Sequence, residues 1–259
     1  MLTTSPLSEI LKSPVLYTNE NNTPKETMNE IERLKAKNII IIGGEKSVSS
    51  QIKDTLSSKY KVQRVAGNNR FDTSNIIANI VMDKNPSSKK AILVSSNSYS
   101  DALAISSLAS KEKMPILITD GKKLSNETEK FIKFKQIEGI IYAGGNYSIS
   151  ESVQKQVEKL GSNKIARYAG KDRYETAAQI AVGVWPNSEY AVYVSGENLS
   201  DALIANSLGA KLKSPILLTK NKEIPNSIKD FAKKIKSENK IVVGGENTVS
   251  KHVFSILKI

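Results

Sequence analysis

Two arginine-containing strings carry the side chains best suited to binding chemistry. RVAGNNRFDT (64–73) returns as RYAGKDRYET (167–176), so four arginines recur in register: Arg64, Arg70, Arg167 and Arg173. A guanidinium close to a helix N-terminus can bind a phosphate or carboxylate through paired hydrogen bonds. The first interpretation is that each arginine pairs with a carboxylate of its own module, such as Asp101 or Asp201, and the second is an anion site.

A second repeated string carries an aspartate. YSDALAISSLA, from Tyr99, returns as LSDALIANSLG, from Leu199, and places Asp101 and Asp201 at the start of an apolar helix. An aspartate there can cap the helix by accepting backbone N–H groups, which is the first interpretation. The second is hydrogen bonding to sugar hydroxyls. Each module supplies one such aspartate, so the paired carboxylates of a glycosidase are not indicated.

A glycine pair closes an apolar run three times, and serine or threonine opens the helix that follows. Such a turn can hold an anion at the helix start, or it can simply allow close packing of helix on strand. It lacks the glycine patterns of dinucleotide and phosphate-loop sites. The turn candidates are Gly43, Gly44, Gly144, Gly145, Gly244 and Gly245.

Few residues are suited to catalysis or metal binding. The 259 residues include no cysteine and one histidine, His252, and no serine lies in a nucleophile elbow. We therefore expect no catalytic residue, no metal site and no cofactor. Nucleic-acid binding would require interleaved aromatic residues or a basic recognition helix, and neither repeats.

The charge balance favours an anionic partner. Lysine and arginine number 38 against 26 acidic residues, a net charge of +12. Such a surface attracts polyanions in general, although most of the lysines are scattered as on an ordinary solvated surface. No apolar run approaches the roughly 18 residues of a membrane span, so membrane insertion is not expected.

The elements that must position these residues are short apolar strands alternating with helices. In the second copy the pattern predicts strands at 61–65, 91–95, 115–119 and 139–143, and helices at 70–82, 100–109, 125–134 and 149–160. Strands this rich in Ile, Val and Leu predict an α/β fold with a mainly parallel sheet flanked by helices. Ligands of such sheets lie beyond the carboxyl ends of the strands, where the repeated residues gather.

The repeat divides the chain into an incomplete first module (1–60), a second module (61–163) and a third module (164–259). Aligned on Pro14, the first module has about 38 residues fewer before this position than the second. No signal peptide is recognisable in the first residues. We expect that Met1 is an internal start or a truncation point, and that an upstream segment completes the first module.

Three strings in fixed order, RYAGKDRYETAAQIA, LSDALIANSLGAKLKSPILLT and IVVGGENTVS, resemble the signature of the cell wall binding repeat 2 family. The resemblance covers two full copies and the tail of a third. It implies tandem Rossmann-like modules packed as a triangular pseudo-trimer. It also implies a secreted, surface-layer-associated protein at the cell wall or cell surface of a Gram-positive bacterium.

The function implied by the resemblance is non-covalent, non-catalytic anchoring to an anionic cell wall polysaccharide. Many modest contacts repeated along a polymer would supply the affinity. The alternatives are a self-assembling surface-layer or adhesion component and a cell wall hydrolase. Transferred position by position, the motif gives these polymer-binding candidates: Arg64, Arg70, Thr73, Asp101, Arg167, Arg173, Thr176 and Asp201.

Overall fold

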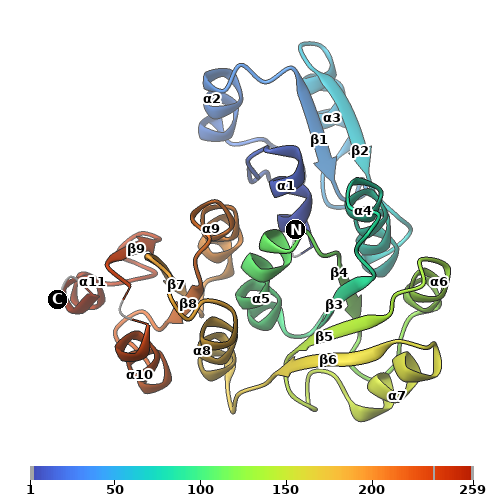
Figure 1. The fold of residues 1–259 in the computed structure, drawn as a ribbon. Coiled ribbons are helices and arrows are strands. Elements are labelled where there is room, and N and C mark those ends of the chain that lie inside the picture. Colours follow the sequence, from blue (N-terminus) through green and yellow to red (C-terminus); the bar gives the residue numbers. More distant parts are fainter. Residues whose placement is uncertain (1–2, 236, 258–259) are drawn as a thin grey trace.

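The computed structural model describes residues 3–235 and 237–257. These residues form three parallel sheets flanked by helices, grouped as three repeated modules (Figure 1). The α/β class and the pseudo-trimeric arrangement expected from the sequence are confirmed. The helices and strands expected in the second copy are all present, with ends that differ from the expected ones by at most two residues.

Sheet 2, in the middle of the chain, is the widest among the described residues, with strand order β4-β3-β5-β6. Its β4 and β5 consist entirely of buried residues. Side chains of α6 and α7 join β4 and β5 in one apolar cluster, which explains why these strands carry no polar face. The elements are β3 (Lys90–Ser95), α5 (Tyr99–Lys111), β4 (Ile116–Thr119), α6 (Asn126–Phe134), β5 (Gly139–Ala143), α7 (Glu151–Lys159) and β6 (Asn163–Tyr168).

Sheet 3 repeats this arrangement with the order β8-β7-β9 over the described residues. Its central strand β7 is buried apart from its first residue, whereas β9, at the edge, is exposed or half-buried throughout. The elements are β7 (Tyr190–Ser195), α9 (Leu199–Leu212), β8 (Ile216–Thr219), α10 (Asn226–Lys234), β9 (Asn239–Val243) and α11 (Lys251–Leu257).

Sheet 1, as far as the structure describes it, is the pair β1-β2. A small apolar cluster around Ile31, Ile41 and Ile52 holds it together. Residues 15–18, which repeat the sequence of β4 and β8, form no strand. The elements are α1 (Ser5–Leu11), α2 (Lys25–Arg33), β1 (Asn38–Ile42), α3 (Ser50–Ser57) and β2 (Lys61–Val65).

Two helices pass from one sheet to the next. Helix α4 (Arg70–Lys84) leads from β2 in sheet 1 to β3 in sheet 2, and α8 (Arg173–Val184) leads from β6 in sheet 2 to β7 in sheet 3. The sequence groups 61–65 with the strands that follow it, but in the structure this strand pairs with β1. The repeats of the sequence are therefore offset from the sheets. We still propose 1–60, 61–163 and 164–259 as the boundaries of the three modules that repeat in the sequence.

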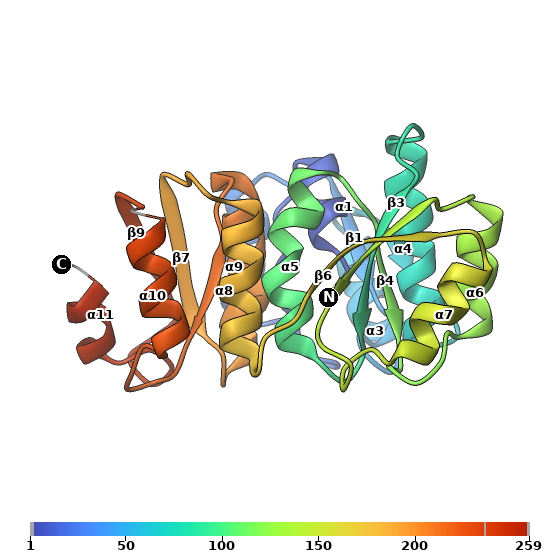
Figure 2. The ribbon, with the colours of Figure 1, turned by 60° about the horizontal axis from the view of Figure 1, so that its bottom comes forward.

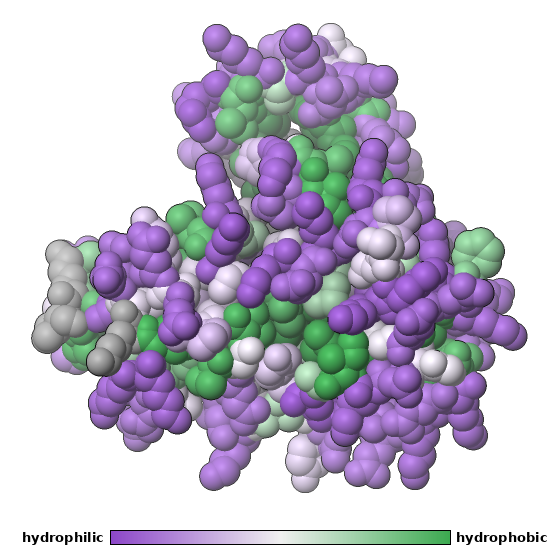
Figure 3. All heavy atoms as spheres, in the orientation of Figure 1, coloured by the Kyte–Doolittle hydropathy of each residue, from purple (hydrophilic) through white to green (hydrophobic). Residues whose placement is uncertain are grey.

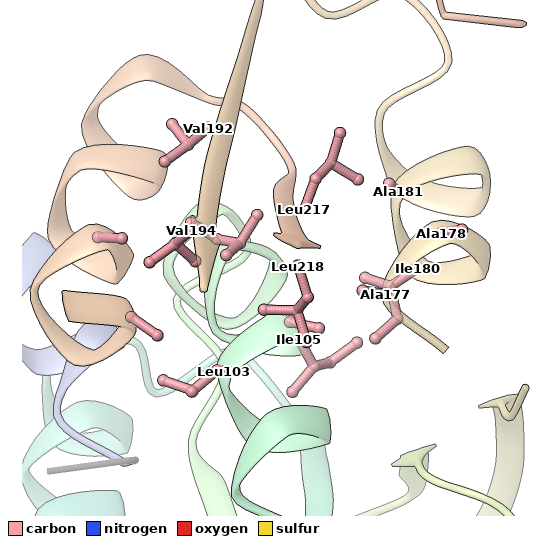
Figure 4. Packing of buried hydrophobic residues seen from close by; sticks show 14 of the residues in the cluster. Leu103, Ile105, Ala177, Ala178, Ile180, Ala181, Val192, Val194, Leu217 and Leu218 are labelled. Carbon is pink, nitrogen blue, oxygen red and sulfur yellow. The ribbon is translucent and has the colours of Figure 1, made fainter. Parts of the chain in front are cut away.

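The two helices that carry the SDAL string, α5 and α9, pack together with α1 at the centre. Helices α1, α5 and α9 contact one another, and Figure 2 shows α5 and α9 standing side by side with α8. The largest apolar cluster joins sheets 2 and 3 through these helices. Ile105 of α5, Leu218 of β8 and Ala177 of α8 meet there (Figure 4).

Candidate functional site

The first glycine of each pair has a backbone conformation that other residues rarely adopt. Its φ is +118° at Gly43, +112° at Gly144 and +129° at Gly244. A Cβ on Gly144 would lie 2.7 Å from an Asp101 carboxylate oxygen, and one on Gly244 would lie 2.8 Å from the corresponding oxygen of Asp201. The turn favours glycine at all three positions, and the close approach of the aspartate adds a second reason at Gly144 and Gly244.

Asp101 is a buried carboxylate at this turn. Its Oδ2 accepts hydrogen bonds from the hydroxyls of Ser98 and of Ser148, the latter at 3.3 Å. Burial raises the pKa of Asp101, while the two serine hydrogen bonds and the positive charge of Arg173 lower it, and the net shift is upward. Helix capping was the first interpretation of this residue, but Asp101 lies within α5, and the N-cap residue Ser98 makes no side-chain capping hydrogen bond. Asp101 instead ties the helix to the glycine turn.

Asp201 repeats this contact in sheet 3. Thr248, which replaces Ser148, donates its hydroxyl to Asp201 Oδ2 at 2.7 Å. The side-chain amide oxygen of Asn198 accepts the Ser200 backbone N–H and caps α9, so this aspartate also connects elements. Both aspartates join the SDAL helix to the loop that follows the glycine pair.

The first arginine of each RxAG string binds backbone carbonyl groups of the glycine turn. Arg64 donates to the carbonyl oxygens of Gly43 at 2.7 Å and Ser49 at 3.2 Å. Arg167 donates to those of Gly144 and Ile149, both at 3.0 Å. Both side chains are half-buried. Arg64 and Arg167 therefore stabilise the turn, and they use carbonyl groups where the sequence suggested aspartates.

The second arginine of each string is exposed at a helix start. Arg173 opens α8 and donates to the carbonyl oxygen of Gly196 at 2.7 Å, at the carboxyl end of β7. Its positive charge also lowers the pKa of Asp101, which lies at the carboxyl end of sheet 2. Arg70 opens α4 and lines a groove that also contains Gly43 and Gly44. These two guanidinium groups are the ones available to solvent.

The threonines of the repeated string hold the loop at the single glycine of that string, Gly67 or Gly170. Thr73 Oγ1 accepts the Gly67 backbone N–H at 2.9 Å, and Thr176 Oγ1 accepts that of Gly170 at 3.0 Å. The helix that follows in the third copy, α8, is capped by Asp172, whose Oδ1 accepts the Glu175 N–H at 2.8 Å. Thr73 and Thr176 shape the loop that presents the second arginine.

These contacts define a recurring group of residues, which we call a node: glycine turn, hydroxyl, aspartate and second arginine. Node 2 has all four members, Gly144, Ser148, Asp101 and Arg173. In the described part of the chain, node 1 has Gly43, Ser47 and Arg70 but no aspartate, and node 3 has Gly244, Thr248 and Asp201 but no arginine.

Sequence analysis identified most node members but assigned Ser148 and Thr248 only to opening a helix. The available signal was spacing, because each hydroxyl follows its aspartate by 47 residues. The second glycines, Gly44, Gly145 and Gly245, mainly continue the turn, and their carbonyl groups accept backbone hydrogen bonds. The exposed Tyr147, in the loop beside node 2, was not singled out.

Metal-ligand clusters and membrane-spanning helices are both absent from the described residues. No place there gathers three metal-binding side chains of the His, Cys, Asp or Glu type. No helix in this part of the chain has the length and apolar content needed to cross a membrane.

The chain is similar in sequence to two proteins of Bacillus subtilis. The chain is 32% identical over 248 residues to an amidase enhancer of Bacillus subtilis, covering 96% of this chain and 33% of that protein. It is 32% identical over 259 residues to the N-acetylmuramoyl-L-alanine amidase LytC of the same organism, covering 99% of this chain and 50% of LytC. The chain thus spans a third to a half of these relatives.

Solved structures share the whole fold. Cwp6 from Clostridium difficile superposes with a TM-score of 0.87 at 26% identity, over 97% of this chain and 42% of Cwp6. Cwp8 from the same organism gives 0.86 at 29% identity, over 99% of this chain and 44% of Cwp8. The sequence pattern of Cell wall binding domain 2 (CWB2) matches residues 1–53, 64–154 and 167–254. The chain therefore belongs to the Cell wall binding domain 2 family.

Proposed function

We propose that this chain is a non-catalytic anchor that binds an anionic cell wall polysaccharide through its nodes, at the surface of a Gram-positive bacterium. The observation that carries the proposal is the arrangement of node 2, where exposed Arg173 donates to the Gly196 carbonyl group and its charge acts on Asp101, which accepts the Ser148 hydroxyl. A guanidinium recognises phosphate or carboxylate groups, and hydroxyls and backbone groups suit sugars.

Electrostatics supports an anionic ligand over a neutral one. The chain carries a net charge of +12, and the second arginines lie at the carboxyl ends of the sheets. Exposed charge pairs are individually weak, commonly below about 1 kcal/mol. Repetition of a node along a polymer raises the overall affinity without any single strong contact, and makes it sensitive to salt.

The surroundings of Asp101 favour binding over hydrolysis. Its carboxylate is buried and accepts hydrogen bonds from two serine hydroxyls, which holds it in the role of an acceptor. The neighbouring charged partner is an arginine rather than a second carboxylate. The activity named for LytC is a property of that longer protein, and the proposal for this chain is retention on the wall.

Sedimentation of the chain with purified Bacillus subtilis walls tests the proposal. We expect retention at low salt, loss at high salt, and loss after chemical extraction of anionic polymers from the walls. Arg173→Gln is expected to weaken retention about 5-fold to 10-fold. Lys171→Gln is the matched control, since it removes the same charge from an exposed neighbour and should weaken retention less.

Three outcomes would contradict the proposal. Retention that survives polymer extraction would exclude the anionic ligand. Release of wall fragments would indicate a hydrolase, and ordered arrays formed without walls would indicate a self-assembling layer.

A further inference from the structure

Tyr147 lies at a position of the glycine turn that folding leaves free to vary. In all three turns the carbonyl oxygen of the second glycine accepts the N–H groups three and four residues later, at 2.9–3.0 Å. The residue just before these donors is Lys46 in the first turn, Tyr147 in the second and Asn247 in the third, and all three are exposed. Because the same turn forms with a cation, an aromatic ring or an amide there, the turn itself does not explain the tyrosine.

The ring of Tyr147 is presented to solvent on a fixed backbone. It is the most exposed large hydrophobic side chain in the described part of the chain, with a relative exposure of 109%. The next residue, Ser148, donates its hydroxyl to Asp101 of node 2, and the Ser150 N–H donates to the Gly121 carbonyl oxygen at 2.8 Å. A fully exposed ring adds no packing stability, whereas a loop held in place lowers the entropic cost of binding a ligand.

Two lysines lie on the loop that packs against this turn. The contact is close, since a Cβ on Gly121 would lie 2.2 Å from the Ser148 carbonyl oxygen. Lys122 and Lys123 follow this glycine and are exposed. Their backbone N–H groups both donate to Asp120 Oδ1 at 2.8 Å, which fixes the loop. The loops that follow β4 and β5 therefore place an aromatic ring and two ammonium groups at the carboxyl end of sheet 2.

The surroundings of Tyr147 favour a saccharide over a protein as the ligand. Figure 3 shows the surface over α7, the helix that follows this loop, as mainly hydrophilic. One aromatic ring among hydrophilic side chains does not form the apolar patch typical of a protein interface. It does suit a sugar ring, which has C–H groups on its faces and hydroxyls at its edges, because tyrosine offers a large flat contact at little conformational cost.

We infer that Tyr147 stacks on a sugar ring of the wall polymer, while Lys122 and Lys123 contact an anionic group of the same repeating unit. This inference rests on the proposed function and specifies its ligand, a polymer whose glycosyl units carry or alternate with phosphate or carboxylate groups. Nodes 1 and 3 have Lys46 and Asn247 at the equivalent position, so the stacking contact belongs to node 2.

Sedimentation with purified Bacillus subtilis walls at several salt concentrations separates the two contacts. Tyr147→Ala should weaken retention about 3-fold to 10-fold at every salt concentration, because stacking on a ring does not depend on charge. Tyr147→Phe keeps the ring and should keep most of the retention. Lys122→Gln combined with Lys123→Gln should weaken retention mainly at low salt and reduce its dependence on salt.

Phe134→Ala is the matched control for loss of an exposed aromatic ring. Phe134 is 82% exposed at the end of α6, which leads to the amino end of β5, so it lies at the opposite end of sheet 2 from Tyr147. Its removal should leave retention unchanged. The midpoint of urea denaturation should be the same in every variant, because all of these side chains are exposed.

The outcomes distinguish this inference from the proposed function. Full retention of Tyr147→Ala, with retention still weakened in Arg173→Gln, would overturn the inference and leave the proposed function intact. An equal loss in Tyr147→Phe and Tyr147→Ala would also overturn it, since the hydroxyl would then be the contact. So would a loss in Tyr147→Ala that disappears at high salt, as expected for the lysines. An original chain that does not sediment with walls would contradict the proposed function itself, and this inference with it.

Discussion

Sheets 1 and 2 contain nearly the same strand sequences but bury them very differently. MPILIT in sheet 2 is buried throughout, whereas the repeated SPVLYT is exposed or half-buried. IIYAGG is likewise buried up to its second glycine, and IIIIGG is mostly not. Apolar sequence therefore does not bury a strand on its own, because burial in a parallel sheet requires a neighbour on each side and helices on both faces.

The nodes differ in the same way. Node 2 unites residues from four segments far apart in the sequence. Over the described residues, nodes 1 and 3 each have three of the four members. The difference between sheet 2 with node 2 and the other sheets and nodes can be tested by comparing equivalent residues. The tests below range from the stability of the core to the pKa of one carboxyl group.

Truncation of a core leucine should show the largest difference. Leu117→Ala removes a fully buried side chain from sheet 2 and is expected to cost about 2–5 kcal/mol of unfolding free energy. The equivalent Leu16→Ala, in the half-exposed segment, should cost about 1 kcal/mol or less. Urea denaturation measures both, and equal costs would mean that sheet 1 is packed as tightly as sheet 2.

The next largest difference between sheets 1 and 2 should appear in the rates of backbone hydrogen exchange. Strand β5 lies between β3 and β6, whereas β1 pairs with β2 alone among the described strands. Amides of residues 139–143 should therefore exchange about a hundredfold more slowly than those of residues 38–42. Equal protection in the original chain would indicate that another strand covers β1 in solution.

The pH dependence of stability should identify the buried carboxylate of node 2. Burial raises the pKa of Asp101 above its ordinary value of 3.8, so the native state holds this proton more tightly than the unfolded state. Stability from this group is therefore lost as pH rises from 3.8 through the raised pKa. Asp101→Asn should flatten this part of the pH profile and be relatively more stable at pH 7 than at pH 3.

Urea denaturation across this pH range measures the effect, with Asp201→Asn in node 3 as the matched substitution. An identical change of slope in both variants would show that the pH dependence does not arise from the environment of node 2.

The smallest expected effect is a change in the pKa of one group, Asp101. The positive charge of Arg173 lowers the pKa of Asp101, so Arg173→Gln should raise that pKa further. Arg70→Gln should leave it unchanged, because Arg70 lies in node 1. Titration of the Asp101 carboxyl carbon by NMR compares the two variants. An equal response would mean that Asp101 senses only the overall charge of the molecule.

Much of the site could be predicted from the repeated strings, but not the contacts within it. The arginines, aspartates and glycines were found because they recur in register. Their roles were harder to predict, since Arg64 and Arg167 bind carbonyl groups and Asp101 accepts hydroxyl hydrogen bonds instead of capping its helix. A repeated residue shows that a position is used, while its partners depend on segments brought together by folding.

The sequence by itself determined the elements, their order and the α/β class, because strand and helix formation follow local apolar periodicity and local turn residues. Only the tertiary structure decided which strands share a sheet. Strand β2 joins β1 and β6 joins β5, so α4 and α8 each lead from one sheet to the next. Pairing of parallel strands depends on contacts between segments that are far apart in the sequence. The local sequence pattern of a strand therefore does not identify its partner.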